Sequence, residues 1–173
     1  MIWYTAFVVL VGVERVAELV VAARNAGWSF AHGGKEYARG QVAPMILLHV
    51  GLLVGCLAEA WLGGVFLPWL GWPMLALVLL ANALRWWCIH ALGPQWNTRV
   101  IVVPGLSAVH RGPYRWMRHP NYVAVAVDGA ALPLVYTGWI TAIAFTVLNA
   151  VFLLRFRIPA EERALAALTD SAA

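Results

Sequence analysis

Residues 112–122 combine aromatic, basic and amide side chains in a short segment that holds two prolines, Pro113 and Pro120. A proline fixes its own backbone and disfavours helical geometry in the residue before it, so this segment is expected to form a rigid turn. Such a turn can present aromatic rings to a base, open backbone groups to its edges, and His119 to a hydroxyl or a carboxylate. These residues therefore predict a binding site for a polar, nucleotide-like ligand.

A second candidate segment follows the last apolar stretch, where Arg157 precedes Glu161 by four residues and Glu162 comes next. In a helix this spacing places Arg157 and Glu161 on one face. The arginine could bind an anion, and the glutamate could accept hydrogen bonds from ribose hydroxyls or from an amine. A glutamate at the start of a helix can equally serve as a structural cap. From the residues alone, the functional and the structural interpretation of Glu161 both stay open.

The elements that position these segments follow from a composition unlike that of a soluble protein. Hydrophobic residues make up 62% of the 173 residues and charged residues only 12%, whereas soluble domains carry about 25% charged residues. The ten tryptophans suit a protein that places rings at the level of the lipid headgroups. The net charge is +4, but the basic residues fall between apolar stretches, so no nucleic-acid binding is expected.

Five apolar stretches approach the roughly 20 residues that a bilayer-crossing helix needs. They cover about residues 2–23, 42–62, 72–92, 121–136 and 138–156. The predicted fold class is all-α integral membrane, with about five transmembrane helices in a single domain over residues 1–173. The fourth stretch is short and is expected to form a helical hairpin with the fifth. The candidate binding segments, residues 93–122 and 157–168, then become a loop and a C-terminal helix at one end of the bundle.

The basic residues predict which end of the bundle faces the cytoplasm. Ten of the twelve lie in alternate connections: Arg24, Lys35, Arg39, Arg99, Arg111, Arg115, Arg118, Arg155, Arg157 and Arg163. By the positive-inside rule, the first and third connections and the C-terminus are expected to be cytoplasmic, with the N-terminus outside. The first stretch lacks a basic leader and contains charged residues, so we expect it to remain in the mature protein.

Charged residues inside the predicted spans need partners, because an unpaired charge in hydrocarbon is costly. Glu14 and Glu18 share one helix face and could line a polar pocket. The favoured interpretation is an internal ion pair with Arg15 or Arg85. Asp128 is a further candidate for such a structural role.

Five short motifs occur in a characteristic order and spacing. They are Leu-Gly at 92–93, Trp-Asn-Thr-Arg at 96–99, Gly-Pro-Tyr-Arg at 112–115, Arg-His-Pro-Asn-Tyr at 118–122, and Arg157 followed by Glu161 and Glu162. Together they resemble the isoprenylcysteine carboxyl methyltransferase family over about residues 85–165. Residues 96–99 and 100–105 are most similar to bacterial members associated with methylation of alkylresorcinols or alkylpyrones. The chain ends before the aromatic and basic C-terminal extension that usually contributes acceptor contacts in the family.

This resemblance implies an S-adenosylmethionine-dependent O-methyltransferase in the bacterial cell membrane, whose cofactor is enclosed on the cytoplasmic side by the loop and the C-terminal helix. The residues that it assigns to the cofactor pocket are Ser107, Val109, Tyr114, His119, Pro120, Asn121, Tyr122 and Glu161. Arg157 would be the catalytic residue that faces the methyl acceptor. The implied acceptor is a lipid-like small molecule, either an alkylresorcinol or alkylpyrone hydroxyl or a prenylcysteine carboxylate, and membrane lipids surround the protein.

Two other functions are compatible with parts of the sequence. A membrane sterol-type reductase shares a similar Arg-His-Pro loop but would bind NADPH, and this chain is short for one. A small transporter or scaffold would keep the buried charges and would have no affinity for a nucleotide. Methyl transfer from a sulfonium requires no metal, and neither cysteine has metal-ligand spacing, so no metal site is expected.

Overall fold

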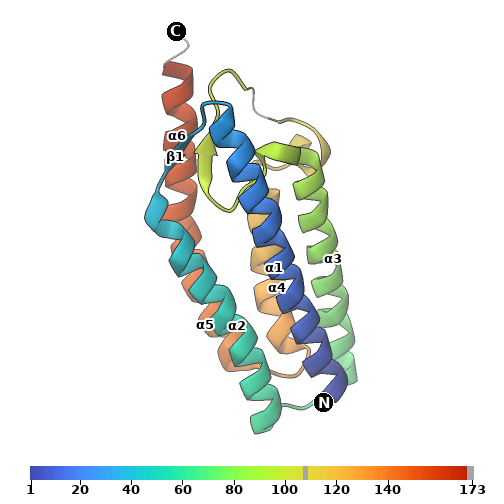
Figure 1. Ribbon diagram of the computed structural model, residues 1–173. Helices are drawn as coiled ribbons and strands as arrows, with labels where there is room; N and C mark the ends of the chain where they lie inside the picture. Colours follow the sequence, from blue (N-terminus) through green and yellow to red (C-terminus); the bar gives the residue numbers. More distant parts are fainter. Residues whose placement is uncertain (107–108, 171–173) are drawn as a thin grey trace.

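The computed structural model describes residues 1–106 and 109–170, with side chains described up to residue 166. Six α-helices in this part of the chain run along one long axis (Figure 1). They are α1 Ile2–Ala31, α2 Val42–Leu62, α3 Pro68–Leu92, α4 Pro120–Leu134, α5 Trp139–Phe152 and α6 Ile158–Asp170. A π-helical segment, Leu153–Arg157, joins α5 to α6 without a break.

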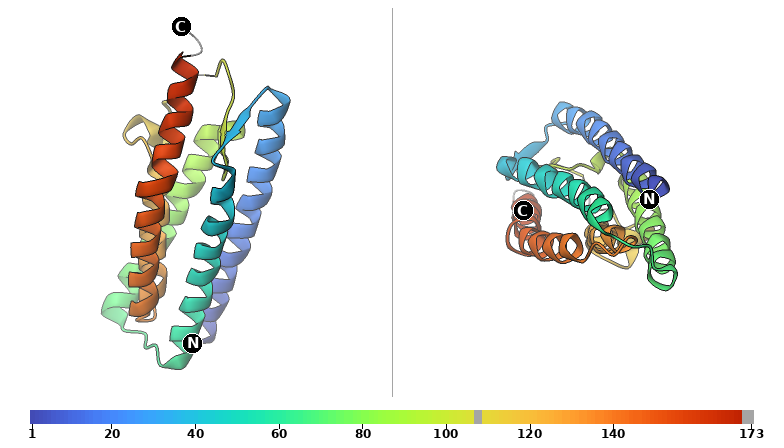
Figure 2. Two further views of the ribbon diagram at one scale, coloured as in Figure 1. Left: turned by 90° about the vertical axis from the view of Figure 1, so that its left-hand side faces the viewer. Right: turned by 90° about the horizontal axis from the view of Figure 1, so that it is seen from below.

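The helices pack mainly as antiparallel neighbours, α3 against α4, α4 against α5, and α1 against α2. The N-terminus and the C-terminus lie at opposite ends of the bundle (Figure 2). Prolines start two of the helices, because Pro68 and Pro120 occupy first-turn positions where no intrahelical N–H is needed. Gly93 ends α3 with a positive φ of 56°, and the chain leaves the bundle there to form the long connection to α4.

Three described helical stretches are long and apolar enough to cross a membrane: Arg39–Leu62, Pro68–Gln95 and Trp139–Ala166. Exposed apolar side chains on their outer faces, such as Leu80 and Val147, give the protein the surface of a membrane protein. The helix α1 contains four charged residues, Glu14, Arg15, Glu18 and Arg24, and α4 has only 15 residues. The five-span topology therefore stays a prediction, as does the orientation in the membrane.

A compact core occupies the end of the bundle near the N-terminus. Tyr4 is fully buried, stacks on Tyr136 with ring centroids 4.8 Å apart, and donates its hydroxyl to the Leu132 carbonyl oxygen at 2.8 Å. Leu52 of α2 and Val78 of α3 belong to the same cluster. The cavity described below opens toward the other end of the bundle.

Buried ion pairs separate the core from that open end, and they confirm the structural interpretation of the charges in the spans. Glu18 accepts from Arg15 Nη1 at 2.9 Å and from Arg85 Nε at 2.6 Å. Arg15 also lies 3.9 Å from Asp128, and Glu14 lies 3.5 Å from Arg15. The pairs tie α1 to α3 and α4, and each buried charge has an opposite charge beside it, as a low-dielectric interior requires.

A short antiparallel ribbon departs from the predicted all-α class. Strand β1, Lys35–Tyr37, pairs with strand β2, Val100–Val102, so that Lys35 lies opposite Val102 and Tyr37 opposite Val100. The run of β-branched residues in β2 favours an extended chain. The pairing joins two connections that are far apart in the sequence, and no local pattern in β1 indicates it. The predicted C-terminal helix over residues 157–168 is continuous with α5 through the π-helical segment.

Candidate functional site

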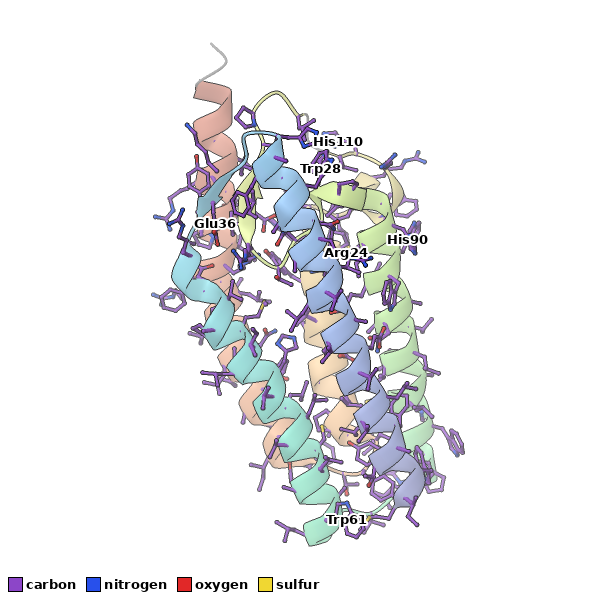
Figure 3. All side chains as sticks on the ribbon, viewed as in Figure 1. Arg24, Trp28, Glu36, Trp61, His90 and His110 are labelled. Carbon is purple, nitrogen blue, oxygen red and sulfur yellow. The ribbon has the colours of Figure 1, made fainter. Side chains whose placement is uncertain are left out.

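A cavity of about 700 Å³ opens at the end of the bundle that carries β1, β2 and α6. Glu36 and His110 lie at this end, and Trp61 lies at the opposite one (Figure 3). The walls come from the end of α3, the connection that follows it, the start of α4, and the π-helical segment with α6. Met45 and His49 of α2, Ser29 of α1 and Asn149 of α5 also line it. The volume lies in the range of small-molecule sites.

The π-helical segment aims Arg157 into this cavity. A π-helical turn holds more residues than an α-helical turn and therefore rotates the side chains that follow it about the helix axis. Arg157 is only 6% exposed, whereas Arg155 in the same segment faces outward. The Nη2 of Arg157 donates to the Thr98 carbonyl oxygen at 2.8 Å, and its Nε donates to the Tyr122 hydroxyl at 3.1 Å. The guanidinium is thus held from two sides at the cavity wall.

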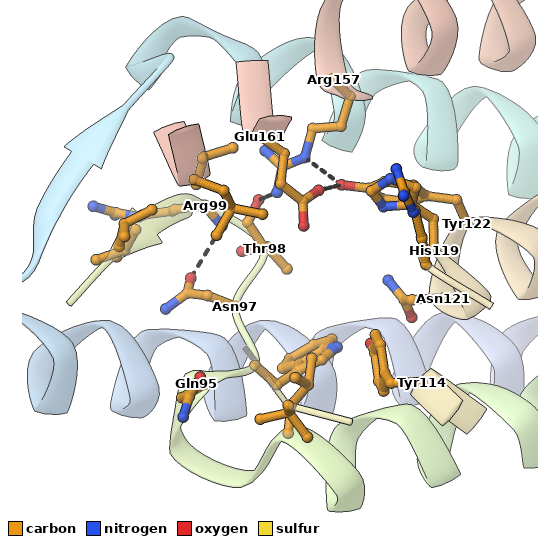
Figure 4. Close-up of a pocket in the computed structure, with 18 of the residues that line it drawn as sticks. Gln95, Asn97, Thr98, Arg99, Tyr114, His119, Asn121, Tyr122, Arg157 and Glu161 are labelled. Carbon is orange, nitrogen blue, oxygen red and sulfur yellow. Dashed lines mark hydrogen bonds between the residues drawn. The ribbon is translucent and has the colours of Figure 1, made fainter. Parts of the chain in front are cut away.

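Glu161 lies one turn further along, in the first turn of α6. Its carboxylate accepts a hydrogen bond from the Tyr122 hydroxyl, which itself accepts from Arg157 (Figure 4). Tyr122 therefore links the first turn of α4 to both α6 and the π-helical segment. Because α6 continues the preceding helix, it has no free N-terminal N–H groups to cap. The interpretation of Glu161 as a helix cap is wrong.

The motif at 118–122 organises the start of α4. Pro120 takes the first helical position and is buried behind the cavity wall, outside the lining itself. The ring of His119 stacks on that of Tyr122, with centroids 5.3 Å apart, and both rings line the cavity. Pro120 thus fixes the start of α4 between His119 and Tyr122, which both line the cavity.

The 3₁₀ helix η3, Gly112–Arg115, brings Tyr114 to the wall opposite Arg157 (Figure 4). At Gly112 the φ angle is +59°, and a Cβ would lie 2.9 Å from the Cβ of Ala91, so only glycine lets η3 close onto α3. Burial raises the pKa of Tyr114 above its ordinary value. The phenol is therefore neutral over the physiological range and can donate a hydrogen bond to a ligand.

Two buried polar atoms in the cavity wall have no hydrogen-bond partner among the described residues. They are the donor Nδ2 of Asn97 and the acceptor Oδ1 of Asn121. Buried polar groups in folded proteins are almost always satisfied, so a ligand with a polar edge is a natural partner for this pair. The turn that carries Asn97 is held by Asn25, whose Nδ2 donates to the Trp96 carbonyl oxygen at 2.7 Å.

Most of the predicted site residues meet at this one cavity. Those that line it are Val109, Tyr114, His119, Asn121, Tyr122, Arg157 and Glu161. Ser107 lies outside the described residues. Lining residues outside the predicted set include Ser29, Met45, His49, Arg85, Trp96, Asn97, Thr98, Arg99 and Asn149. The sequence did contain a signal for some of these, because residues 96–99 belong to a recognised motif and His49, Arg85 and Asn149 are polar residues within apolar stretches.

A smaller apolar groove of about 310 Å³ adjoins the polar cavity. It runs between α4 and the segment formed by α5 and α6, and its walls include Val123, Ala126 and Leu154. His119, Tyr122, Asn149 and Leu153 line both the groove and the cavity. The His119–Tyr122 pair therefore stands where a polar space meets an apolar one.

Comparison with known proteins identifies similar sequences. A model of the isoprenylcysteine carboxyl methyltransferase (ICMT) family matches residues 74–167. The uncharacterized protein YpbQ of Bacillus subtilis (strain 168) is 35% identical over 167 residues, which cover 95% of this chain and 96% of that protein. The matched family segment includes every described residue that lines the cavity apart from Ser29, Met45 and His49.

Proposed function

Since this chain belongs to the isoprenylcysteine carboxyl methyltransferase family, a family of membrane methyltransferases, we propose that it methylates an oxygen of a lipid-tailed acceptor with S-adenosylmethionine as donor. The observation that carries the proposal is the position of Tyr122. Its ring lies between the polar cavity and the apolar groove, and its hydroxyl binds both Arg157 and Glu161. A water-soluble donor and an apolar acceptor could meet there.

The polar cavity suits the methyl donor, S-adenosylmethionine, in size and in chemistry. The unpartnered Asn97 and Asn121 atoms offer one donor and one acceptor to the edge of a base, and Tyr114 adds a neutral hydroxyl. Glu161 is placed to accept from an amine or from ribose hydroxyls. S-adenosylmethionine, when bound, would supply a methyl group on a sulfonium that leaves as a neutral thioether. The chain's own contribution is then to hold and orient the two reactants.

Arg157 is the residue that we assign to the acceptor. Its guanidinium is fixed by Thr98 and Tyr122, and a fixed positive charge can stabilise the negative charge of an attacking oxygen without reorganising. The acceptor class that we propose is a phenolic or enolic hydroxyl, as in an alkylresorcinol or alkylpyrone. This choice is supported by the similarity of residues 96–105 to bacterial family members associated with such compounds.

The adjoining groove supports a lipid-tailed acceptor. Its lining is almost wholly apolar, and it lies between helices that are themselves apolar on their outer faces. A tail could lie in this groove while the head group reaches Arg157. From the distribution of arginines we further propose that this end of the bundle is cytoplasmic. Activity of a C-terminal reporter that functions only on the periplasmic side would contradict that orientation.

Ligand binding to the purified protein tests the proposed donor. Calorimetric titration is expected to give binding of adenosylhomocysteine and none of NADPH, and Glu161→Gln and His119→Ala are expected to weaken the former in folded protein. Binding of NADPH alone would favour a reductase. Absence of binding of either compound would support a transporter or scaffold and overturn the proposal.

A further inference from the structure

The segment that precedes α4 carries an exposed surface whose residues do not line the cavity. This segment stands out from the side of the bundle near the C-terminal end of α3 (Figure 2). Tyr114 faces the cavity, whereas Arg111, Arg115 and Trp116 are exposed. Trp116 packs edge-on against Trp87 of α3, with ring centroids 5.8 Å apart. We call Trp87, Arg111, Arg115 and Trp116 the tryptophan–arginine patch.

The patch is ordered by specific contacts. Arg111 Nε donates to the Ala91 carbonyl oxygen at 2.8 Å, and the Arg115 guanidinium lies 5.9 Å from the centre of the Trp116 ring. Both tryptophans nonetheless remain open to the surroundings, at 47% exposure for Trp87 and 68% for Trp116. Such large exposed rings are characteristic of residues at the boundary between lipid tails and headgroups.

The level of the patch along the helix agrees with that boundary. Trp87 precedes the end of α3 at Leu92 by five residues, which corresponds to roughly 7 Å along the helix axis. A headgroup layer is about 5–7 Å thick on each side of the hydrocarbon core. Because α3 is one of the apolar spans, the patch therefore lies at headgroup depth when the helix crosses a bilayer.

The charge of the patch is uncompensated by the protein. The sequence has no Asp or Glu between Glu59 and Asp128. Within the described part of the chain, the ion pairs involve neither Arg111 nor Arg115. A guanidinium with free N–H groups is suited to paired hydrogen bonds with a phosphate. Exposed tryptophans beside it favour a phosphate that belongs to a lipid over one that is free in water.

We propose that the tryptophan–arginine patch binds the headgroup phosphate of an anionic phospholipid in the leaflet at the cavity end of the bundle. Arg111 and Arg115 hold the phosphate, and the two tryptophan rings lie against the upper part of the acyl chains. Since Tyr114 sits between these arginines and faces inward, a lipid bound there also steadies one wall of the cavity. The proposal goes beyond methyl transfer and stands whichever ligand the cavity takes.

The test uses tryptophan fluorescence of the full-length protein in phosphatidylcholine bilayers that contain a minor fraction of brominated lipid. The difference between the native protein and Trp116→Phe isolates the quenching of Trp116. We expect brominated phosphatidylglycerol to quench this signal at a much lower mole fraction than brominated phosphatidylcholine. Each arginine contributes roughly fivefold to the preference for an anionic headgroup, so Arg111→Gln/Arg115→Gln should lower it on the order of twentyfold.

The matched control is Arg24→Gln/Arg155→Gln, which removes two exposed charges elsewhere and should keep the preference. Equal quenching by the two lipids, or an equal loss in the control, would overturn the proposal. A second measurement needs no variant: added sodium chloride should lower the native preference because it screens exposed charges. A preference that does not change with salt would also overturn it. So would loss of the preference at low concentrations of inorganic phosphate, because the site would then bind free phosphate and not a lipid.

Discussion

The Tyr122 hydroxyl donates a hydrogen bond to the Glu161 carboxylate and so closes the wall of the cavity between α4 and α6. The same hydroxyl accepts from Arg157 Nε. One phenol therefore sets the relative position of a positive and a negative side chain that come from the chain's last helical segment. The stacked ring of His119 fixes the Tyr122 ring from the other side.

Removing only this hydroxyl should loosen the site without removing the ring. For Tyr122→Phe we expect adenosylhomocysteine affinity to fall by about tenfold to a hundredfold, since a hydrogen bond to a charged group contributes roughly 1.5–3 kcal/mol. Calorimetric titration measures the affinity. Tyr136→Phe is the matched control, because it removes a hydroxyl that bonds the N-terminal amine at the far end of the bundle. Equal affinities in the two variants would show that the Tyr122 bridge does not order the cofactor site.

Replacement of Asn121 should weaken adenosylhomocysteine binding without lowering the stability of the fold. Its Oδ1 is buried and unpartnered among the described residues, so replacing the amide with an apolar group of similar shape removes a desolvation cost. Asn121→Leu is therefore expected to unfold at the same temperature as the native protein or higher, while adenosylhomocysteine affinity falls. Asn25→Leu is expected to be destabilised, because the Gly93 and Trp96 carbonyl groups lose their donor. A large drop in the melting temperature of Asn121→Leu would mean that the side chain has an internal partner.

Glu18 should be the most costly carboxylate to neutralise. It is 2% exposed and bridges Arg15 and Arg85, so Glu18→Gln leaves two buried guanidinium groups without their shared counter-charge. Breaking a buried ion pair on one side costs about 3–5 kcal/mol. Thermal unfolding in nanodiscs should show a large drop for this variant and little change for the exposed Glu162→Gln. Similar melting temperatures for both would indicate that the buried network contributes little to stability.

The sequence predicted the site better than it predicted the scaffold around it. Tyr114, His119, Asn121 and Tyr122 lie within one short motif whose prolines restrict the backbone, so their convergence follows from local geometry. Arg157 and Glu161 share a helix face by spacing alone. The motifs also resemble a family whose membership the comparisons confirm.

Features that depend on distant pairing were not predictable in this way. Strand β1 has no pattern of its own and exists because β2 lies beside it. His49 enters the cavity from α2, outside the matched family segment, and its polarity alone could not place it. The π-helical register at Leu153–Arg157 decides that Arg157 faces inward, and a sequence with ordinary helix formers gives no sign of it.

The pH dependence of turnover should report what Arg157 does. A phenol with a pKa near ~10 must lose a proton before it attacks, and a nearby positive charge lowers that pKa by about 1–3 units. The rate should therefore rise with pH, and Arg157→Ala should move this rise to higher pH, whereas Arg157→Lys, which keeps the charge, should move it less. Profiles of kcat/KM against pH measure the shift. A rate that is flat above about pH 6 would instead indicate a carboxylate acceptor, which is already ionised there.

Transfer of a labelled methyl group tests most directly whether the protein methylates a lipid-tailed hydroxyl. Purified protein in bilayers is incubated with methyl-labelled S-adenosylmethionine and an alkylresorcinol or an alkylpyrone, and label is counted in the extracted lipid. We predict label in an O-methyl product with the native protein and a strong loss of label with Arg157→Ala. Methylation of a prenylcysteine carboxylate, with no label in either hydroxyl acceptor at any pH, would contradict the proposed acceptor. No labelled product from any of the three, in protein that binds adenosylhomocysteine, would contradict the proposed class of acceptor altogether.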